Sequence, residues 1–215
     1  MRPEHFSIRR GFPLDQRDEA ARIYWEAFGA KLGRVMGPDK RALAFLTNGL
    51  RPDHCFSALD DSGRLIGLAG FKSVQGSFSG GTSRDLRRVY GVFGSAWRAG
   101  LLRLLSHEVD NERFLIDGIA VAAQARGLGI GTALITTLCR EAKRRGYPSV
   151  RLEVIEGNPR ARALYEREGF TATHTDQLGL LRFAFGFAAA TTMVRQLDDF
   201  PADQAPPPMA PDGPR

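Results

Sequence analysis

Apolar positions along the chain follow two spacings, which together predict a mixture of strands and helices. Unbroken or alternating apolar runs predict strands over residues 5–12, 55–59, 65–73, 114–121, 150–155 and 189–197. Apolar residues three or four positions apart predict helices from about residue 16, over 38–50, over about 83–109, after residue 131, and over 159–168. Asp15 is expected to cap the first helix, and residues 60–63 form a hairpin turn. The pattern therefore predicts an α/β (α+β) fold.

The most informative segment is residues 124–131, a glycine-rich turn between the 114–121 strand and the helix that follows. Glycines there let a ligand come close to the backbone, with several N–H groups pointing outward. The start of the helix adds unpaired N–H donors and the positive end of its dipole. Such a turn can bind a phosphate or a pyrophosphate through its main chain.

Three kinds of phosphate-binding turn compete for this segment. A Walker A loop is rejected, because no lysine precedes Thr132. A dinucleotide fingerprint needs glycine or alanine where Thr132 stands. Glu153 could imitate its ribose-binding acid, but the turn lies past mid-chain and leaves little room for a doubly wound sheet. The third pattern, Gln/Arg-x-x-Gly-x-Gly/Ala, is matched in full by Gln124, Gly127 and Gly129.

A second motif follows at a compatible distance. Residues 158–170 read Asn-Pro-Arg-Ala-Arg-Ala-Leu-Tyr-Glu-Arg-Glu-Gly-Phe, which matches every fixed position of the pattern Asn-x-x-Ala-x-x-Leu-Tyr-x-x-x-Gly-Phe. With both motifs in order, the chain resembles the GCN5-related N-acetyltransferase (GNAT) superfamily over roughly residues 114–171. Its segment 152–165 is similar to the bacterial ribosomal-protein alanine N-acetyltransferases.

The resemblance implies a GNAT fold, which is a central, mixed, mostly antiparallel sheet with splayed strands four and five and flanking helices. It implies acetyl-CoA as co-substrate, with its pantetheine arm in the gap between those strands and its pyrophosphate on the N–H groups of residues 126–131. The acetyl group would pass directly to a primary amine, on a small molecule or at a protein N-terminus or lysine. The residues expected to contact acetyl-CoA are Ile119, Ala120, Val121, Gln124, Arg126, Gly127, Leu128, Gly129, Ile130, Gly131, Thr132, Asn158 and Tyr165.

The resemblance also assigns two groups to proton transfer. Tyr165 matches the family tyrosine near the coenzyme sulfur, so we assign it as the general acid. Its alternative role is ring packing within the helix. Glu153 matches the glutamate that serves as base in the alanine acetyltransferases, and its alternative role is a solvated or salt-bridged strand carboxylate.

Other polar residues have alternative roles or are weaker candidates. Asn158 is expected both to contact the cofactor arm and to cap the helix that begins at Pro159. Asp117 is the second candidate base, because an acid within an apolar strand needs partners when it is buried. Weaker candidates are Glu156, His107 and His174. The sequence shows no metal-binding constellation.

Residues 76–112 match no recognisable pattern and lie outside the segment that resembles the GNAT superfamily. Three interpretations are open: a packed helical insertion, a mobile lid, or an amphipathic helix on a surface. We favour a packed insertion that also lines the acceptor pocket, because three glycines weaken a free helix and Arg98 and Arg103 oppose a membrane span. The predicted organisation is one domain over 1–197 followed by a proline-rich disordered tail over 198–215.

Composition narrows the class of protein further. The net charge is +6, but the basic residues are mostly interspersed with acids, and there is no zinc finger or RNP motif. A basic surface favours an anionic ligand such as coenzyme A, and we predict no nucleic-acid partner. Two cysteines without metal or disulfide spacing, and no secretory signal, predict a cytoplasmic protein. A homodimer is left open. The rivals to an N-acetyltransferase are a non-catalytic acyl-CoA sensor and a nicotinamide-dinucleotide domain.

Overall fold

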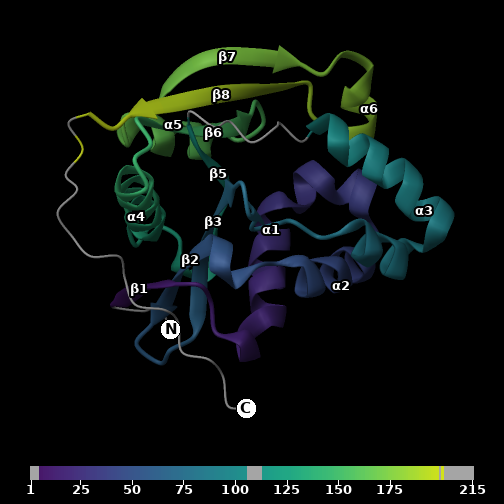
Figure 1. The fold of residues 1–215 in the computed structure, drawn as a ribbon, viewed down its shortest axis with the longest axis horizontal. Coiled ribbons are helices and arrows are strands. Elements are labelled where there is room, and N and C mark those ends of the chain that lie inside the picture. Colours follow the sequence, from purple (N-terminus) through teal and green to yellow (C-terminus); the bar gives the residue numbers. More distant parts are fainter. Residues whose placement is uncertain (1–4, 106–112, 199, 201–215) are drawn as a thin grey trace.

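The protein is built on one mixed, mostly antiparallel sheet with helices on both faces (Figure 1). The computed structural model describes residues 5–105, 113–198 and 200. Within these ranges the sheet order is β1-β2-β3-β5-β6-β8-β7, and β4 pairs with β3. The strands are β1 (Phe6–Arg10), β2 (Cys55–Asp60), β3 (Leu65–Ser73), β4 (Gly76–Ser77), β5 (Phe114–Val121), β6 (Ser149–Ile155), β7 (Thr171–Gln177) and β8 (Ala189–Gln196). The α-helices are α1 (Arg17–Met36), α2 (Asp39–Gly49), α3 (Ser83–Leu105), α4 (Ile130–Arg144), α5 (Pro159–Arg167) and α6 (Arg182–Phe185).

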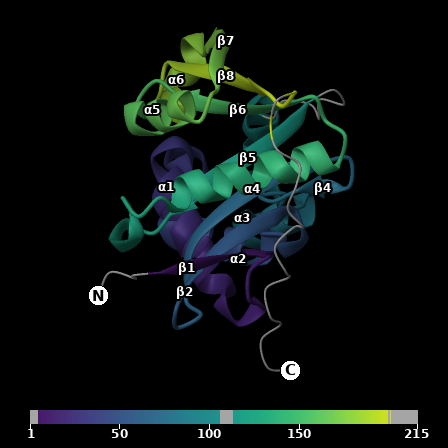
Figure 2. The same cartoon turned by 90° about the vertical axis from the view of Figure 1, so that its left-hand side faces the viewer.

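The sheet separates two hydrophobic cores. One core joins buried residues of α1, α2, α3 and α6 to one face of β2 and β3. The other joins α4 and α5 to the opposite face of β2 and β3, and to β5, β6 and β8. Figure 2, in which α4 crosses in front of the sheet, shows this second side. Neighbouring residues of β3 face opposite cores: Leu65 and Leu68 belong to the first, and Ile66 and Ala69 belong to the second.

Strands β5 and β6 part soon after they meet. They are parallel, and only Phe114 and Leu115 pair with β6, opposite Val150 and Arg151. The rest of β5 is registered with β3 alone among the described residues. Beyond this point no strand in the described part of the chain pairs with the edge of β5 that faces β6. This divergence is the splayed gap that the sequence resemblance implied.

Of segment 76–112, the structure describes residues 76–105. α3 changes direction at Gly91, whose φ of 72° is not helical. Its side chains dock on the end of α1: the Tyr90 hydroxyl donates to the carbonyl of Met36, and Arg98 Nε donates to the carbonyl of Val35 at 2.7 Å. The expected helical residues 106–109 lie outside the described part of the chain.

The structure corrects one local prediction and adds two elements that the sequence analysis did not predict. Asp15 does not cap α1: it lies inside a 3-10 turn (Leu14–Gln16) that leads straight into the helix, where no side chain caps the N-terminus. The short helix α6, which contains Phe183 and Phe185, was not anticipated from the sequence. Strand β7 was not anticipated, because all seven of its residues are exposed and it carries no apolar alternation. It is held by its pairing with β8.

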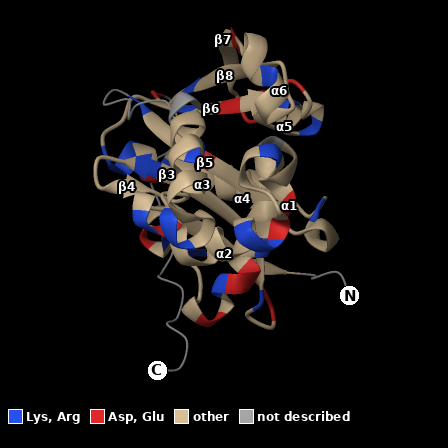
Figure 3. Cartoon of the chain, turned by 90° about the vertical axis from the view of Figure 1, so that its right-hand side faces the viewer, with Lys and Arg blue, Asp and Glu red and all other residues tan. Residues whose placement is uncertain are grey.

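The surface charges agree with the interspersed pattern of the sequence. Figure 3 shows Lys and Arg positions mixed with Asp and Glu positions over the face that carries α1, α2 and α3. No helix within the described residues has the length and apolar character needed to cross a membrane.

Candidate active site

The glycine turn has the backbone that its sequence predicted. Gly127 and Gly129 have φ values of 85° and 79°, which favour glycine strongly. An ideal Cβ at either position would have no heavy atom within 4 Å, so backbone conformation, not crowding, calls for glycine. Gly129 is the N-cap of α4 and no side chain caps the helix. The first turn of α4 therefore keeps its N–H donors for a ligand.

The residues after the turn fix the position of α4. Ile130 is buried under β3, where its Cγ2 would lie 3.0 Å from a Cβ on Gly67. A Cβ on Gly131 would lie 3.0 Å from Leu164 of α5, so this glycine allows the two helices to approach. Thr132 donates its hydroxyl to Glu168 at 2.8 Å, which ties the first turn of α4 to the end of α5.

The residues before the turn form the rim of the gap. Ala120 is buried, whereas Ile119 and Val121 are half-buried. Arg126 folds back so that its Nε donates to the carbonyl of Val121 at 3.2 Å. This contact uses the carbonyl of a residue that is expected to contact acetyl-CoA. Gln124 is exposed.

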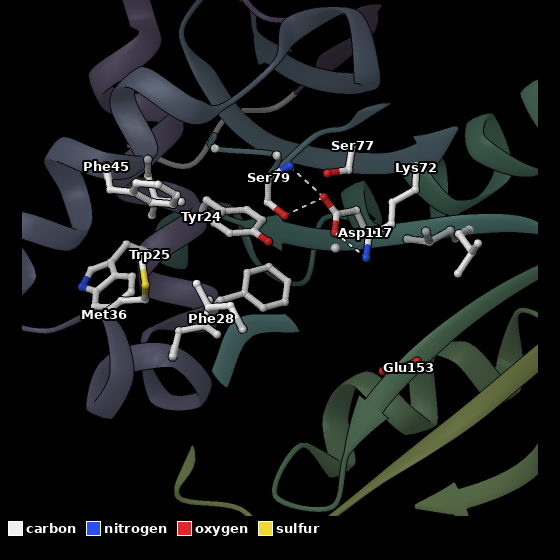
Figure 4. A pocket seen from close by; sticks show the side chains of 18 of the residues that line it. Tyr24, Trp25, Phe28, Met36, Phe45, Lys72, Ser77, Ser79, Asp117 and Glu153 are labelled. Atoms are coloured by element: carbon white, nitrogen blue, oxygen red, sulfur yellow. Dashed lines mark hydrogen bonds and ion pairs between the residues drawn. The ribbon is translucent and has the colours of Figure 1, made fainter. Parts of the chain in front are cut away.

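A cavity of 430 Å³ opens beside this gap. α1, α2 and α3 supply most of its apolar side chains, while β3, β5 and β6 contribute the charged ones (Figure 4). The candidates Tyr165, Glu153 and Asp117 all line it. Tyr165 belongs to the core on the α4 side of the sheet, whereas most of the apolar lining residues belong to the core on the α1 side. The two sides share one cavity because β5 and β6 diverge.

Asp117 is the most enclosed acid of the cavity, with 7% of its side chain exposed. Its Oδ2 accepts hydrogen bonds from both the backbone N–H and the hydroxyl of Ser79, each at 2.7 Å. Lys72 Nζ lies 3.9 Å from Oδ1. Burial, and after it the charge of Asp117, raises the pKa of Tyr24, so that phenol is neutral across the working range of pH.

The side chain of Glu153 is less enclosed than that of Asp117. The Glu153 side chain is 22% exposed, and Arg151 Nη2 donates to its Oε1 at 3.2 Å. The salt-bridged carboxylate that the sequence left as an alternative is thus present, within reach of the same cavity. Two weaker candidates lie elsewhere: Glu156 accepts from the N–H of Ala188, and His174 is exposed on β7 beside Asp176. His107 lies outside the described residues.

Tyr165 and Asn158 lie on and just before α5. Burial raises the pKa of Tyr165 to about 12, and its ring centroid is 6.1 Å from that of Phe170. No described residue hydrogen-bonds to its hydroxyl. Asn158 caps α5 through its Oδ1, which accepts from the N–H of Ala161 at 3.1 Å. That contact leaves the Asn158 amide donors for a ligand.

Several cavity residues were missed by the sequence analysis. Ser79, Phe28 and Phe45 lie far from both motifs along the chain, so neither motif points to them. A signal existed in the glycines: a Cβ on Gly118 would lie 2.5 Å from Phe28, and one on Gly81 would lie 2.2 Å from Phe45. Such glycines mark places where a ring lies against the backbone.

The comparison with protein families bears on one of the rivals, the nicotinamide-dinucleotide domain. The model of the "Acetyltransferase (GNAT) family" matches residues 17–170. The chain belongs to the GNAT acetyltransferase family. Membership in this family favours an acetyltransferase domain over a nicotinamide-dinucleotide domain and leaves the acceptor unspecified.

Individual relatives agree with this assignment. A mycothiol acetyltransferase of Stackebrandtia nassauensis is 45% identical over 58 residues, which are 27% of this chain and only 19% of that protein. The N-acetyltransferase structure from Staphylococcus aureus Mu50 has a TM-score of 0.58 at 17% identity, over 87% of this chain and 99% of that one. The ribosomal-protein alanine N-acetyltransferase of Escherichia coli has a TM-score of 0.51 at 15% identity, over 94% and 99%. Both structures bear on the fold of this GNAT enzyme and not on its acceptor.

Proposed function

We propose that this GNAT enzyme transfers the acetyl group of acetyl-CoA directly to a primary amine bound in the cavity. The observation that carries the proposal is the shared cavity: it brings Tyr165 from one side of the sheet together with Glu153 and Asp117 at the strand gap. A sensor domain that only binds acyl-CoA would not need these groups around an acceptor-sized space.

The turn and the gap suit the cofactor. We assign the pyrophosphate to the N–H groups of residues 126–131, because Gly127 and Gly129 combine the required backbone with open space above it. We assign the pantetheine arm to the free edge of β5 over residues 119–121, with the Asn158 amide nearby on α5. When bound there, acetyl-CoA supplies an activated thioester whose thiolate is a good leaving group.

In our proposal the protein's own residues move two protons. Glu153 accepts the proton that the attacking amine loses, directly or through a water molecule. Tyr165 donates a proton to the departing sulfur. Its pKa of about 12 keeps the phenol protonated at neutral pH, as an acid requires. Asp117, which accepts two hydrogen bonds from Ser79, shapes the cavity wall and is the alternative base.

The first expected result is stabilisation by the cofactor. Acetyl-CoA or CoA at about 100 times its dissociation constant should add ~2.7 kcal/mol to the free energy of unfolding. For a chain of this length the midpoint of thermal unfolding should rise by roughly 5 to 10 °C. NAD at the same concentration should cause no shift. A shift with NAD alone, or with none of the ligands, would contradict the proposed cofactor.

A matched pair of glycine variants assigns that shift to the turn. Gly129 and Gly63 both have a φ of 79° and open space at the Cβ position, but Gly63 lies in the β2–β3 hairpin. Gly129→Ala and Gly63→Ala should therefore lose similar stability, about 1 kcal/mol. Only Gly129→Ala should bind CoA about tenfold more weakly. At an unchanged CoA concentration, this lowers the stabilisation that CoA adds to the free energy of unfolding from ~2.7 to ~1.4 kcal/mol. Equal gains in both variants would exclude Gly129 from the CoA site.

Tyr165→Phe should lower kcat about 10- to 100-fold, measured as CoA release in single-turnover and steady-state assays. The effect is moderate because a thiolate leaves readily even without an acid. Tyr147→Phe is the matched control, because Tyr147 is half-buried against Phe114 and does not line the cavity. An unchanged single-turnover rate in Tyr165→Phe would show that this hydroxyl is not the acid.

We also place the enzyme in the cytoplasm. The proposal is supported by Cys55 and Cys139, which are both free and buried. Burial raises the pKa of Cys139 to about 11, so its thiol is unreactive. No metal-binding group of acids, histidines or cysteines occurs within the described residues, and none of the proposed steps uses one.

A further inference from the structure

The cavity has two chemically different ends. Its four charged lining residues, Lys72, Asp117, Arg151 and Glu153, all stand on strands. The residues that α1, α2 and α3 contribute carry no charge, and nearly all are apolar. Figure 4 shows this division: Trp25 and Phe45 lie away from Asp117 and Lys72, and Tyr24 lies between the two groups, beside Ser79. The charged end is the end that meets the strand gap and Tyr165.

Aromatic rings build the boundary between the two ends. Tyr24 and Phe28 stack with their centroids 4.4 Å apart. The Phe28 ring lies on the backbone of Gly118, the residue that follows Asp117. Phe45 lies in the same way on Gly81, at the far wall. An acceptor that reaches the gap with its reactive group must therefore leave the rest of its body among these rings.

The charges at the strand end balance one another. Asp117 faces Lys72 and also accepts a hydrogen bond from Ser79. Glu153 accepts a hydrogen bond from Arg151, so the two negative side chains are matched by two positive ones. The cavity thus has no surplus of negative charge for a polycation. A second charge on the acceptor would fall in the apolar end, where it would lose its hydration without gaining a partner.

We propose that the acceptor is a primary amine with a single charge and an apolar alkyl or aryl body. The amine lies at the strand end, beside Glu153 and Asp117, and the body lies between α1, α2 and α3. This inference rests on the proposed function and names the substrate class of the same site. It excludes polyamines, polycationic antibiotics and polar peptide N-termini as preferred acceptors.

The test measures the binding of straight-chain amines, from propylamine to octylamine, to the full chain saturated with CoA, by calorimetry. Each methylene that enters the apolar end should tighten the dissociation constant about fourfold until the cavity is full. Heptylamine should bind about 100-fold more tightly than the hexane diamine of matching length, which differs by the second charge. Dissociation constants that do not change with chain length, or a diamine or short peptide that binds as tightly, would overturn the inference.

A pair of variants on α3 locates the apolar end. Ala99 lines the cavity, whereas Ala96, on the same helix, is exposed and does not. Ala99→Leu should fill part of the apolar end, so the dissociation constant should stop falling at a shorter amine. Octylamine should bind this variant at least about tenfold more weakly than it binds the unaltered enzyme. Ala96→Leu should leave the whole series unchanged. Identical series in the two variants would place the alkyl chains elsewhere and overturn the inference.

The two proposals fail in distinguishable ways. Absence of stabilisation by acetyl-CoA and CoA contradicts the proposed function. The amine series, measured on the protein without CoA, then still shows whether the cavity binds amines with an apolar body. Stabilisation by CoA with a flat amine series overturns only the acceptor class. Turnover measured as CoA release should rank the amines in the order of their affinities.

Discussion

Replacement of Glu153 by glutamine is expected to lower kcat about 100- to 1,000-fold, the range of a positioned general base. The exchange keeps the length of the side chain and an oxygen that can accept from Arg151, so it removes charge and basicity with little change in shape. CoA binding, read from the shift in thermal unfolding, should stay as in the unaltered enzyme. The measurement is the rate of CoA release with an acceptor amine at saturation.

The pH profile separates a lost base from a distorted site. Without Glu153 the reaction depends on amine that is already neutral in solution, so the rate of Glu153→Gln should climb about tenfold per pH unit until the pH reaches the amine's pKa. Glu156→Gln is the matched control, because Glu156 lies three positions along the chain, is exposed, and does not line the cavity. It should keep full activity at every pH.

Asp117→Asn tests whether Asp117, rather than Glu153, is the general base. We expect a loss of less than about tenfold in kcat and a larger rise in KM, because Asp117 holds Ser79 in the cavity wall. A loss of more than 100-fold in Asp117→Asn, together with near-normal turnover in Glu153→Gln, would exchange the roles of these residues.

Glu141→Gln is expected to cost about 3 kcal/mol of the free energy of unfolding. The Glu141 side chain is 1% exposed, and it accepts from Arg10 at 3.1 Å, from Arg144 at 2.9 Å and from Arg145 at 2.7 Å. Removal of one partner from such a group leaves guanidinium charges without a counter-ion, at a cost of about 3–5 kcal/mol when fully buried. The three arginines are partly exposed, which places the estimate at the lower end.

Urea unfolding measures this loss, and pH tests its cause. Burial alone would raise the pKa of Glu141, but the hydrogen bonds from Arg144 and Arg145 lower it below its ordinary value of 4.5. A carboxyl whose pKa is lowered on folding adds stability above its unfolded pKa and loses it as the pH falls through the folded value. The difference between Glu141→Gln and the unaltered chain should therefore be constant near neutrality and shrink below pH 4.5.

Glu166→Gln provides the control for Glu141. Glu166 pairs with Arg162 on α5, where both side chains are about half exposed. Its replacement should cost at most about 0.5 kcal/mol. If the two variants lost equal stability, the arginine cluster around Glu141 would not be an unusually strong tie between α4 and β1.

The sequence predicted best those parts whose chemistry is local. The Gly127–Gly129 turn and the Asn158 cap depend on backbone conformations set within a few residues, and both are present in the structure. Strand β7 was missed because its stability comes from pairing with β8, and its exposed polar residues leave no periodic trace. The sequence pattern does not single out Glu141, because its partner Arg10 is 131 positions away.

The site was predicted in part for the same reason. Tyr165 and Glu153 were found through their motifs, and their roles stay predictions. The acceptor wall was not readable, because Ser79 and Phe45 meet the site only through the packing of the β3–β4 hairpin, α2 and α3 onto the sheet. No local pattern encodes that packing.

The order of the site's parts along the chain has an evolutionary consequence. The apolar wall comes from residues before 103, while the turn, Glu153 and Tyr165 all come after 116, with the gap between β5 and β6 as the place where they meet. Mutations can therefore accumulate in the first stretch and change which amines fit, while the second stretch stays under selection for one unchanging donor. Gene lineages of this architecture should diverge in acceptor preference fastest through their N-terminal halves, and recombination near residue 113 would exchange preferences without rebuilding the catalytic groups.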